Sequence, residues 1–123
     1  MAMNQKILII EDEPIISSDI IAQLYKCGNY NVEAIDNGDQ INSDCVGKYD
    51  LILCNHKLSN GWIDQLLINK LRQMSEHIVF ITGIRECEKK NKSNQRDQYE
   101  ILYKPFSFYQ LKKVLQQNGI AYW

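Results

Sequence analysis

Short apolar runs alternate along this chain with longer segments in which apolar residues recur at helical spacing. The apolar runs cover residues 6–10, 31–35, 50–55, 77–82 and 100–103. The helical segments between and after them cover residues 14–27, 39–46, 62–74, 85–98 and 107–117. This alternation is typical of buried parallel strands joined by helices. It predicts an α/β protein with a flavodoxin-like (βα)5 fold, in which a doubly wound, five-stranded parallel sheet is the middle layer of a three-layer sandwich.

Two of the predicted helices have a clear apolar face. The first begins at Pro14, a residue suited to the first helical position, and ends at Gly28-Asn29. Its apolar positions are Ile15, Ile16, Ile20 and Leu24. The apolar positions of the helix at 62–74 are Ile63, Leu66, Leu67, Leu71 and Met74. These spacings predict that both helices pack on the sheet.

The last helix has the strongest start signal in the chain. Ser107 followed by Gln110 fits a capping box, and Phe106 with Leu111 fits a hydrophobic staple. Asn118-Gly119 predicts the helix end. Residues 120–123 (IAYW) then either cap the core or offer exposed aromatic rings to a partner or a second subunit.

The segments at 39–46 and 85–98 have little apolar patterning. A helix without an apolar stripe gains little from packing, so we expect the helix at 85–98 to be short, displaced or mobile. Between residues 85 and 96, five basic residues are opposed by only two acidic ones. We interpret this basic stretch as a solvated face, with contact to an acidic partner or RNA as the alternative.

Composition narrows the class of protein further. The chain has 123 residues, 45% of them hydrophobic, which suits a single domain over 1–123. Its net charge of −1 gives no global preference for nucleic acid or an anionic membrane. The sequence has no signal-peptide pattern and no apolar stretch near the ~20 residues of a membrane helix. The four cysteines, Cys27, Cys45, Cys54 and Cys87, form no C-x-x-C pair, so we expect reduced structural thiols, no zinc site and a cytoplasmic location.

Polar residues end four of the five predicted strands. The first strand ends in the acidic residues 11–13, the third in Asn55, the fourth in Thr82 and the fifth in Lys104. Parallel strands bring their carboxyl ends to the same edge of a sheet, where ligands of doubly wound folds bind. The sequence therefore predicts a site made of acids, an amide, a hydroxyl and a lysine.

These pieces together resemble a response-regulator receiver domain of two-component signalling. The resemblance rests on residues 6–14 (KILIIEDEP), residues 49–55 (YDLILCN), Thr82 and residues 104–106 (KPF), in that order and at receiver-like separations. In that family, the residue that ends the third strand is an aspartate that accepts a phosphoryl group from a histidine kinase. Asn55 stands at this phosphoacceptor position.

The resemblance also implies roles for the other residues. Glu11 and Asp12 match the acidic pair that holds magnesium, and the backbone carbonyl of Lys57 matches another metal ligand. Thr82 matches the hydroxyl that reorients toward the phosphoryl group. Lys104 matches the lysine that pairs with the acceptor and then with the phosphoryl group. Pro105 is the candidate for a cis peptide bond.

Several positions depart from the family pattern. Asn55 is neutral and cannot form an acyl phosphate, so the site lacks a nucleophile. Loop 56–61 (HKLSNG) lacks the usual proline, and Ile101 replaces the usual switching Tyr or Phe. Residues 97–98 are Asp-Gln where a Gly-Ala pair is usual. This cluster of changes favours natural divergence over an engineered substitution at position 55.

The departures at the acidic site change its expected metal chemistry. With Asn55 neutral, Lys104 is expected to pair with Asp12 or Glu11. Magnesium, with Glu11, Asp12, Asn55 and Lys57 as candidate ligands, is then expected to bind only weakly.

We therefore expect an atypical, stand-alone receiver that is not an enzyme and signals without phosphorylation, by protein–protein interaction. Its partners would be signalling proteins, such as a histidine kinase or a downstream target, or a second copy in a weak homodimer. The sequence shows no dedicated nucleic-acid domain and no membrane segment. The alternative is an active phosphorelay receiver, with His56 or an aspartate at position 55 of the native gene as acceptor. A haloacid-dehalogenase-like phosphatase would need Asp-x-Asp after the first strand, where this chain has Glu11-Asp12-Glu13.

Overall fold

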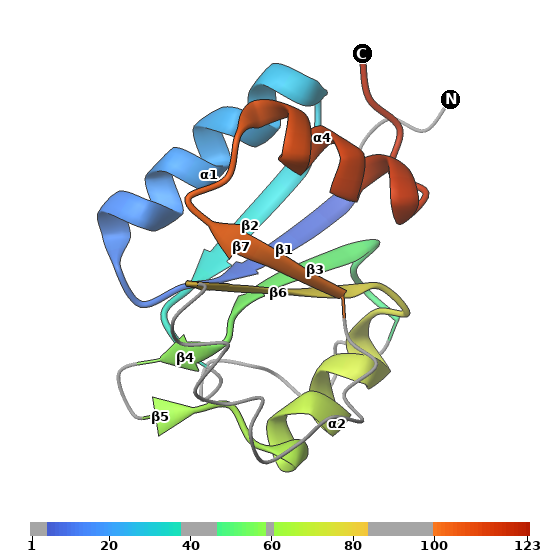
Figure 1. Cartoon of the computed structure of the whole chain (residues 1–123). Helices are drawn as coiled ribbons and strands as arrows, with labels where there is room; N and C mark the ends of the chain where they lie inside the picture. The colour runs from blue at the N-terminus through green and yellow to red at the C-terminus, as the bar shows by residue number, and fades with distance from the viewer. Residues whose placement is uncertain (1–4, 38–46, 59–60, 84–99) are drawn as a thin grey trace.

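Five parallel strands form the central sheet of the protein (Figure 1). The computed structural model describes residues 5–37, 47–58, 61–83 and 100–123. The strands are β1 (Lys6–Ile10), β2 (Asn31–Ile35), β3 (Leu51–Asn55), β6 (Ile78–Gly83) and β7 (Glu100–Lys104). Their order in the sheet is β2-β1-β3-β6-β7, with every neighbouring pair parallel. The predicted doubly wound fold is confirmed, and the strand order reverses between β1 and β3.

Helices cover both faces of the sheet (Figure 1). Helices α1 (Pro14–Cys27) and α4 (Phe108–Gln117) lie on one face, and α2 (Gln65–Met74) lies on the other. Successive residues of a strand point to opposite faces. Ile7 and Ile9 of β1 accordingly belong to the core under α1 and α4, whereas Leu8 and Ile10 belong to the core under α2. The sheet is buried on both sides, which explains why its strands are continuous apolar runs.

The prediction that Ile15 and Leu66 pack on the sheet is wrong. Ile15 is 85% exposed and Leu66 is 67% exposed. Helix α2 begins at Gln65 rather than at 62, because the Asp64 side chain caps it by accepting a hydrogen bond from the Leu67 N–H (2.9 Å). With that start, Ile68 faces the core in place of Leu66. Hydrophobic spacing alone did not fix which apolar residues face the sheet.

A short antiparallel pair of strands, β4 (Lys57–Leu58) and β5 (Gly61–Trp62), follows β3 and was not predicted. The expected helices at 39–46 and 85–98 lie outside the described residues. So do the basic stretch, the 97–98 pair, Cys45 and Cys87. Cys27 and Cys54 are free and buried, as expected of structural thiols. No helix in the described ranges is long and apolar enough to cross a membrane.

The C-terminal residues return to the body of the protein. Ile120 is 3% exposed and belongs to the core beneath α1 and α4. The Tyr30 hydroxyl donates to the Ala121 carbonyl (2.5 Å), and the Trp123 N–H donates to the Cys27 carbonyl (2.6 Å). The side chain of Trp123 is nevertheless 74% exposed. The core-cap interpretation thus holds for Ile120, while Trp123 leaves its indole ring at the surface.

The start of α4 has the predicted capping box. The Ser107 hydroxyl oxygen accepts from the Gln110 N–H (3.1 Å), and the Gln110 side chain accepts from the Ser107 N–H (2.7 Å). Leu111 belongs to the core cluster on this face and the half-buried Phe106 packs against that cluster, as expected of a hydrophobic staple. Gly119 follows the helix with φ +72°, a conformation that glycine adopts without strain.

We predict that Ser107→Ala destabilises the protein by about 1 kcal/mol, because it removes an N-cap acceptor. Urea unfolding followed by circular dichroism would measure the change. Ser18→Ala, at an exposed position within α1, is the matched control and should be close to neutral. Equal destabilisation by the two variants would contradict a role for the cap.

Candidate functional site

The sheet brings the predicted site residues to one edge. Glu11 directly follows β1, and its N–H donates to the Ile35 carbonyl at the end of β2 (3.1 Å). Asn55 ends β3 and pairs with Ile81 of β6. Thr82 of β6 precedes Gly83, which pairs with Lys104 at the end of β7. Parallel register alone therefore carries these side chains to neighbouring strand ends.

Asn55 lies between a carboxylate and an ammonium group. Its Nδ2 donates to Glu11 Oε2 (3.3 Å), and its Oδ1 accepts from Lys104 Nζ (3.4 Å). The two halves of the amide thus match a negative and a positive partner, and the reverse orientation would satisfy neither. We call this arrangement the Glu11–Asn55–Lys104 bridge. Both distances are near the long limit for a hydrogen bond, so each bond is individually weak.

Glu11 is the most buried carboxylate of the site, at 3% exposure. Its Oε2 also accepts from the Glu13 N–H (3.0 Å), while its buried Oε1 has no hydrogen-bond partner among the described residues. Burial raises the pKa of the Glu11 carboxyl, and the Glu13 N–H and the Lys104 charge lower it part of the way. An acid of this kind can accept a cation at Oε1.

The expected direct pairing of Lys104 with Glu11 or Asp12 is wrong for the described structure. No ion pair joins Lys104 to either carboxylate in the described part of the chain, and its ammonium group contacts the Asn55 amide instead. The amide oxygen of Asn55, at the end of β3 on the far side of β6, offers the ammonium group an acceptor at 3.4 Å. The positive charge of Lys104 still lowers the pKa of the Glu11 carboxyl, against the larger rise that burial causes.

The acidic residues can hold a divalent cation. One carboxylate oxygen from each of Glu11, Asp12 and Glu13 lies within 4.8 Å of the others. Magnesium prefers such oxygen ligands, and the unpartnered Glu11 Oε1 fits one of its positions. Asn55 Oδ1, the other candidate ligand at this edge, is engaged by Lys104. Lys57, whose carbonyl is a further candidate, starts β4 two residues after Asn55.

The remaining predicted residues lie outside the bridge, with Thr82 and Pro105 near the same edge and Ile101 near the start of β7. Thr82 is fully buried, and its hydroxyl donates to the Gly83 carbonyl (3.4 Å). Ile101 is half-buried in β7, opposite Phe80 of β6. The Lys104–Pro105 peptide bond is cis.

His56 follows Asn55 but packs as a half-buried ring. Its N–H donates to the Ile81 carbonyl (2.8 Å), and its ring lies 5.6 Å from the Phe80 ring, centroid to centroid. Its position is therefore tied to the core beneath α2, to which Phe80 belongs.

Asp19 and Gln23 were not singled out from the sequence, although they lie close to Lys104. Both line the same surface pocket as Lys104, and Gln23 Nε2 donates to Asp19 Oδ2 (2.9 Å). Their only sequence signal is the i, i+4 spacing on α1, which is common on solvated helix faces.

Residues 7–116 match the family model of the response regulator receiver domain. The chain is similar to the receiver domain of sensor histidine kinase PA1611 from Pseudomonas aeruginosa PAO1, with 25% identity and a TM-score of 0.71. That match covers 94% of this chain and 98% of the other, whose structure has magnesium coordinated in the active site cleft. No curated protein matches the chain.

Two further solved structures share the fold. A response regulator receiver protein from Sinorhizobium medicae WSM419 has 22% identity and a TM-score of 0.72, with 94% of each chain covered. The anti-anti-sigma factor PhyR from Bartonella quintana has 23% identity and a TM-score of 0.72, with 95% of this chain and 48% of that chain covered. The family match spans β1 to α4, and the polar strand ends meet where the family places its site. The chain therefore belongs to the response regulator receiver domains of two-component signalling.

Proposed function

We propose that this receiver signals by protein–protein interaction and without phosphorylation at position 55. The observation that carries the proposal is the Asn55 side chain, held between Glu11 and Lys104 at the position that the resemblance assigns to the acceptor. An acyl phosphate forms when a carboxylate oxygen attacks phosphorus. The amide oxygen is neutral, and a hydrogen bond from an ammonium group withdraws electron density from it further. The site therefore keeps the charge-neutralising groups of phosphoryl transfer but lacks the nucleophile.

The bridge also supports a single resting arrangement of the site. Asn55 is 6% exposed, and each end of its amide has a charged partner. A partner protein can change this arrangement only if it binds one conformation better than another. We therefore propose that the signal depends on which protein binds the receiver, either a histidine kinase or a downstream target.

The surface of β7 and α4 is our candidate for that contact. Tyr103 on β7 is 40% exposed and Tyr109 on α4 is 79% exposed. Exposed aromatic rings are enriched in protein interfaces. The same surface would serve a weak homodimer.

Magnesium at this site would be held by Glu11, Asp12 and the Lys57 carbonyl. When bound, the ion would neutralise the acidic residues and supply a positive centre for an anionic ligand. Asn55 adds no charge to the ligand set, and the Lys104 ammonium group lies close enough to oppose the ion. These two features support weak binding.

We expect the protein to gain no phosphoryl group when it is incubated with magnesium and acetyl phosphate. Asn55→Asp should gain one, because the carboxylate supplies the missing nucleophile beside Lys104. Intact mass spectrometry of both proteins measures the difference. Asn69→Asp, an exposed position on α2, makes the same charge change away from the site and should stay unmodified.

The outcomes separate the candidate functions. Phosphorylation of the parent would overturn the proposal, and mapping the modified residue would show whether His56 is the acceptor. Finding an aspartate at position 55 in protein isolated from its native source would also overturn the proposal. If the Asn55→Asp variant also gains no phosphoryl group, the site lacks more than the acceptor carboxylate.

Asn55→Asp should also bind magnesium about ten-fold more tightly than the parent, since it adds a carboxylate to the ligand set. Isothermal titration calorimetry with magnesium chloride measures both affinities. Adding Asp12→Asn to the variant should remove the gain. Equal affinities of parent and variant would mean that position 55 does not touch the ion.

The raised pKa of Glu11 predicts a pH-dependent stability in the presence of a chelator. Its ordinary pKa is 4.5, and burial raises it, so the folded protein holds this proton more strongly than the unfolded chain. Stability should therefore fall as the pH rises from the unfolded pKa through the folded pKa. Glu11→Gln keeps an acceptor for the Glu13 N–H and for Asn55 but carries no charge.

The variant should thus have a higher Tm than the parent at pH 7, and the gap should close toward about pH 4. Thermal unfolding across this range measures it. Glu13→Gln, at an exposed position, is the matched control and should leave the pH profile nearly unchanged. A gap that is constant with pH would show that the Glu11 charge is not the cause.

A further inference from the structure

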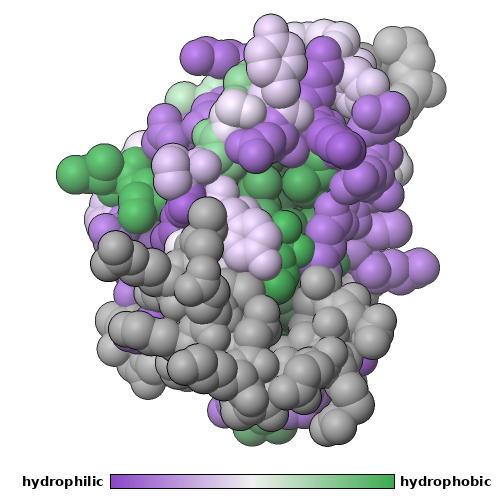
Figure 2. All heavy atoms as spheres, viewed as in Figure 1, coloured by the Kyte–Doolittle hydropathy of each residue, from purple (hydrophilic) through white to green (hydrophobic). Residues whose placement is uncertain are grey.

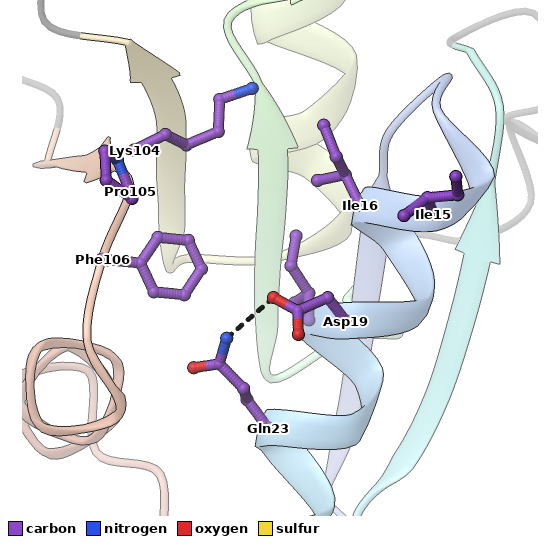
Figure 3. A pocket seen from close by; sticks show the side chains of 8 residues that line it. Ile15, Ile16, Asp19, Gln23, Lys104, Pro105 and Phe106 are labelled. Atoms are coloured by element: carbon purple, nitrogen blue, oxygen red, sulfur yellow. Dashed lines mark hydrogen bonds between the residues drawn. The ribbon is translucent and has the colours of Figure 1, made fainter.

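A surface pocket of about 580 Å³ lies between residues 15–23 of α1 and residues 104–106 at the end of β7 (Figure 3). Ile16 and Ile20 line it from α1, and Pro105 and Phe106 line it from the opposite side. The Phe106 ring points across the pocket toward α1 (Figure 3). Apolar atoms also reach the surface on the side where α1 begins, at the left edge of Figure 2. The body of the pocket therefore suits an apolar occupant.

One end of the pocket is polar and incompletely hydrogen-bonded. Gln23 donates through Nε2 to Asp19 Oδ2 (2.9 Å), which fixes the direction of its amide. This places Gln23 Oε1 on the side of the segment that carries Phe106 (Figure 3). That oxygen is buried and has no hydrogen-bond partner among the described residues. A buried acceptor of this kind favours any occupant that brings an N–H or O–H donor.

We propose that this pocket binds a small apolar molecule that carries an N–H or O–H donor. The apolar walls would hold its body, and Gln23 Oε1 would accept its hydrogen bond, with the Asp19 carboxylate beside it favouring a donor over an acceptor. The volume lies within the range of about 300–1,000 Å³ that is usual for small-molecule sites. This binding does not require phosphorylation at position 55.

The proposed ligand would also touch the signalling site. Lys104 lines the pocket, and its ammonium group reaches Asn55 at 3.4 Å. Pro105, the next residue, forms part of the wall. A ligand that contacts Lys104 can therefore alter the Glu11–Asn55–Lys104 bridge, and so supply an input that needs no phosphoryl group.

Indole, an aromatic body with one N–H donor, is a suitable probe. In a titration followed by 1H–15N NMR, indole should shift the amide signals of α1 and of residues 104 and 106. It should bind about ten-fold more tightly than 1-methylindole, which has the same body but no donor. Gln23→Met removes the acceptor at similar side-chain size and should abolish this difference. Ile16→Trp should fill the pocket and weaken binding of both probes.

Three results would overturn the proposal. Indole could fail to bind at millimolar concentration, or it could shift signals remote from α1 and β7. The two indoles could also bind equally, with no effect of Gln23→Met. This would show that Gln23 Oε1 does not select the ligand, and it would favour an apolar contact surface for a partner protein. A well-dispersed spectrum of each free variant controls for folding.

Discussion

The Asn55 amide connects the two charged groups of this site, and the behaviour of the site depends on that connection. Hydrogen bonds to charged groups contribute about 1.5–3 kcal/mol when short, and the 3.3 Å and 3.4 Å separations here place both bonds below that range. The larger effect is electrostatic. A carboxylate at position 55 would face Glu11 with no donor between them, and their repulsion would have to be relieved by a metal ion or by Lys104. The amide removes the repulsion and, with it, both the nucleophile and much of the demand for a cation.

The sheet determines which residues can meet in this way. Ile7 and Ile9 anchor β1 to one core, Leu8 and Ile10 anchor it to the other, and a slip by one residue would exchange the two sets. The parallel ladders then leave Glu11, Asn55 and Lys104 at the same edge of the sheet, with β6 between the strands that carry Asn55 and Lys104. The β3–β6 ladder thus positions the backbone of residue 55, and the side chain that this residue carries determines the chemistry at the edge.

Most of the fold, and the gathering of polar strand ends at one edge of the sheet, could be predicted from the sequence, whereas several contacts could not. Buried parallel strands are continuous apolar runs, and the Ser107 capping box is a local signal, so both were found. Ile15 and Leu66 were misassigned because several apolar faces fit one helix, and the Asp64 cap decided the start of α2. The partner of Lys104 was also wrong, because it depends on distances across three strands that composition and spacing do not encode. The same limit applies to Gln23, because only the folded structure shows that its side-chain oxygen is buried without a hydrogen-bond partner among the described residues.

Lys104 lies between the strand-end site and the proposed ligand pocket, so it would be the physical link between the two. Its side chain lines the pocket beside α1, while its ammonium group contacts the Asn55 amide at the strand ends. Two sites are coupled when both ligands shift the arrangement of the same structural element. A single side chain that reaches both sites is the simplest element of this kind. In a receiver with an aspartate, phosphorylation acts on this lysine from the side of the strand ends. If position 55 has no acceptor in this chain, as proposed, a ligand in the pocket would be the remaining means of moving Lys104 and of changing the surface that a partner protein binds.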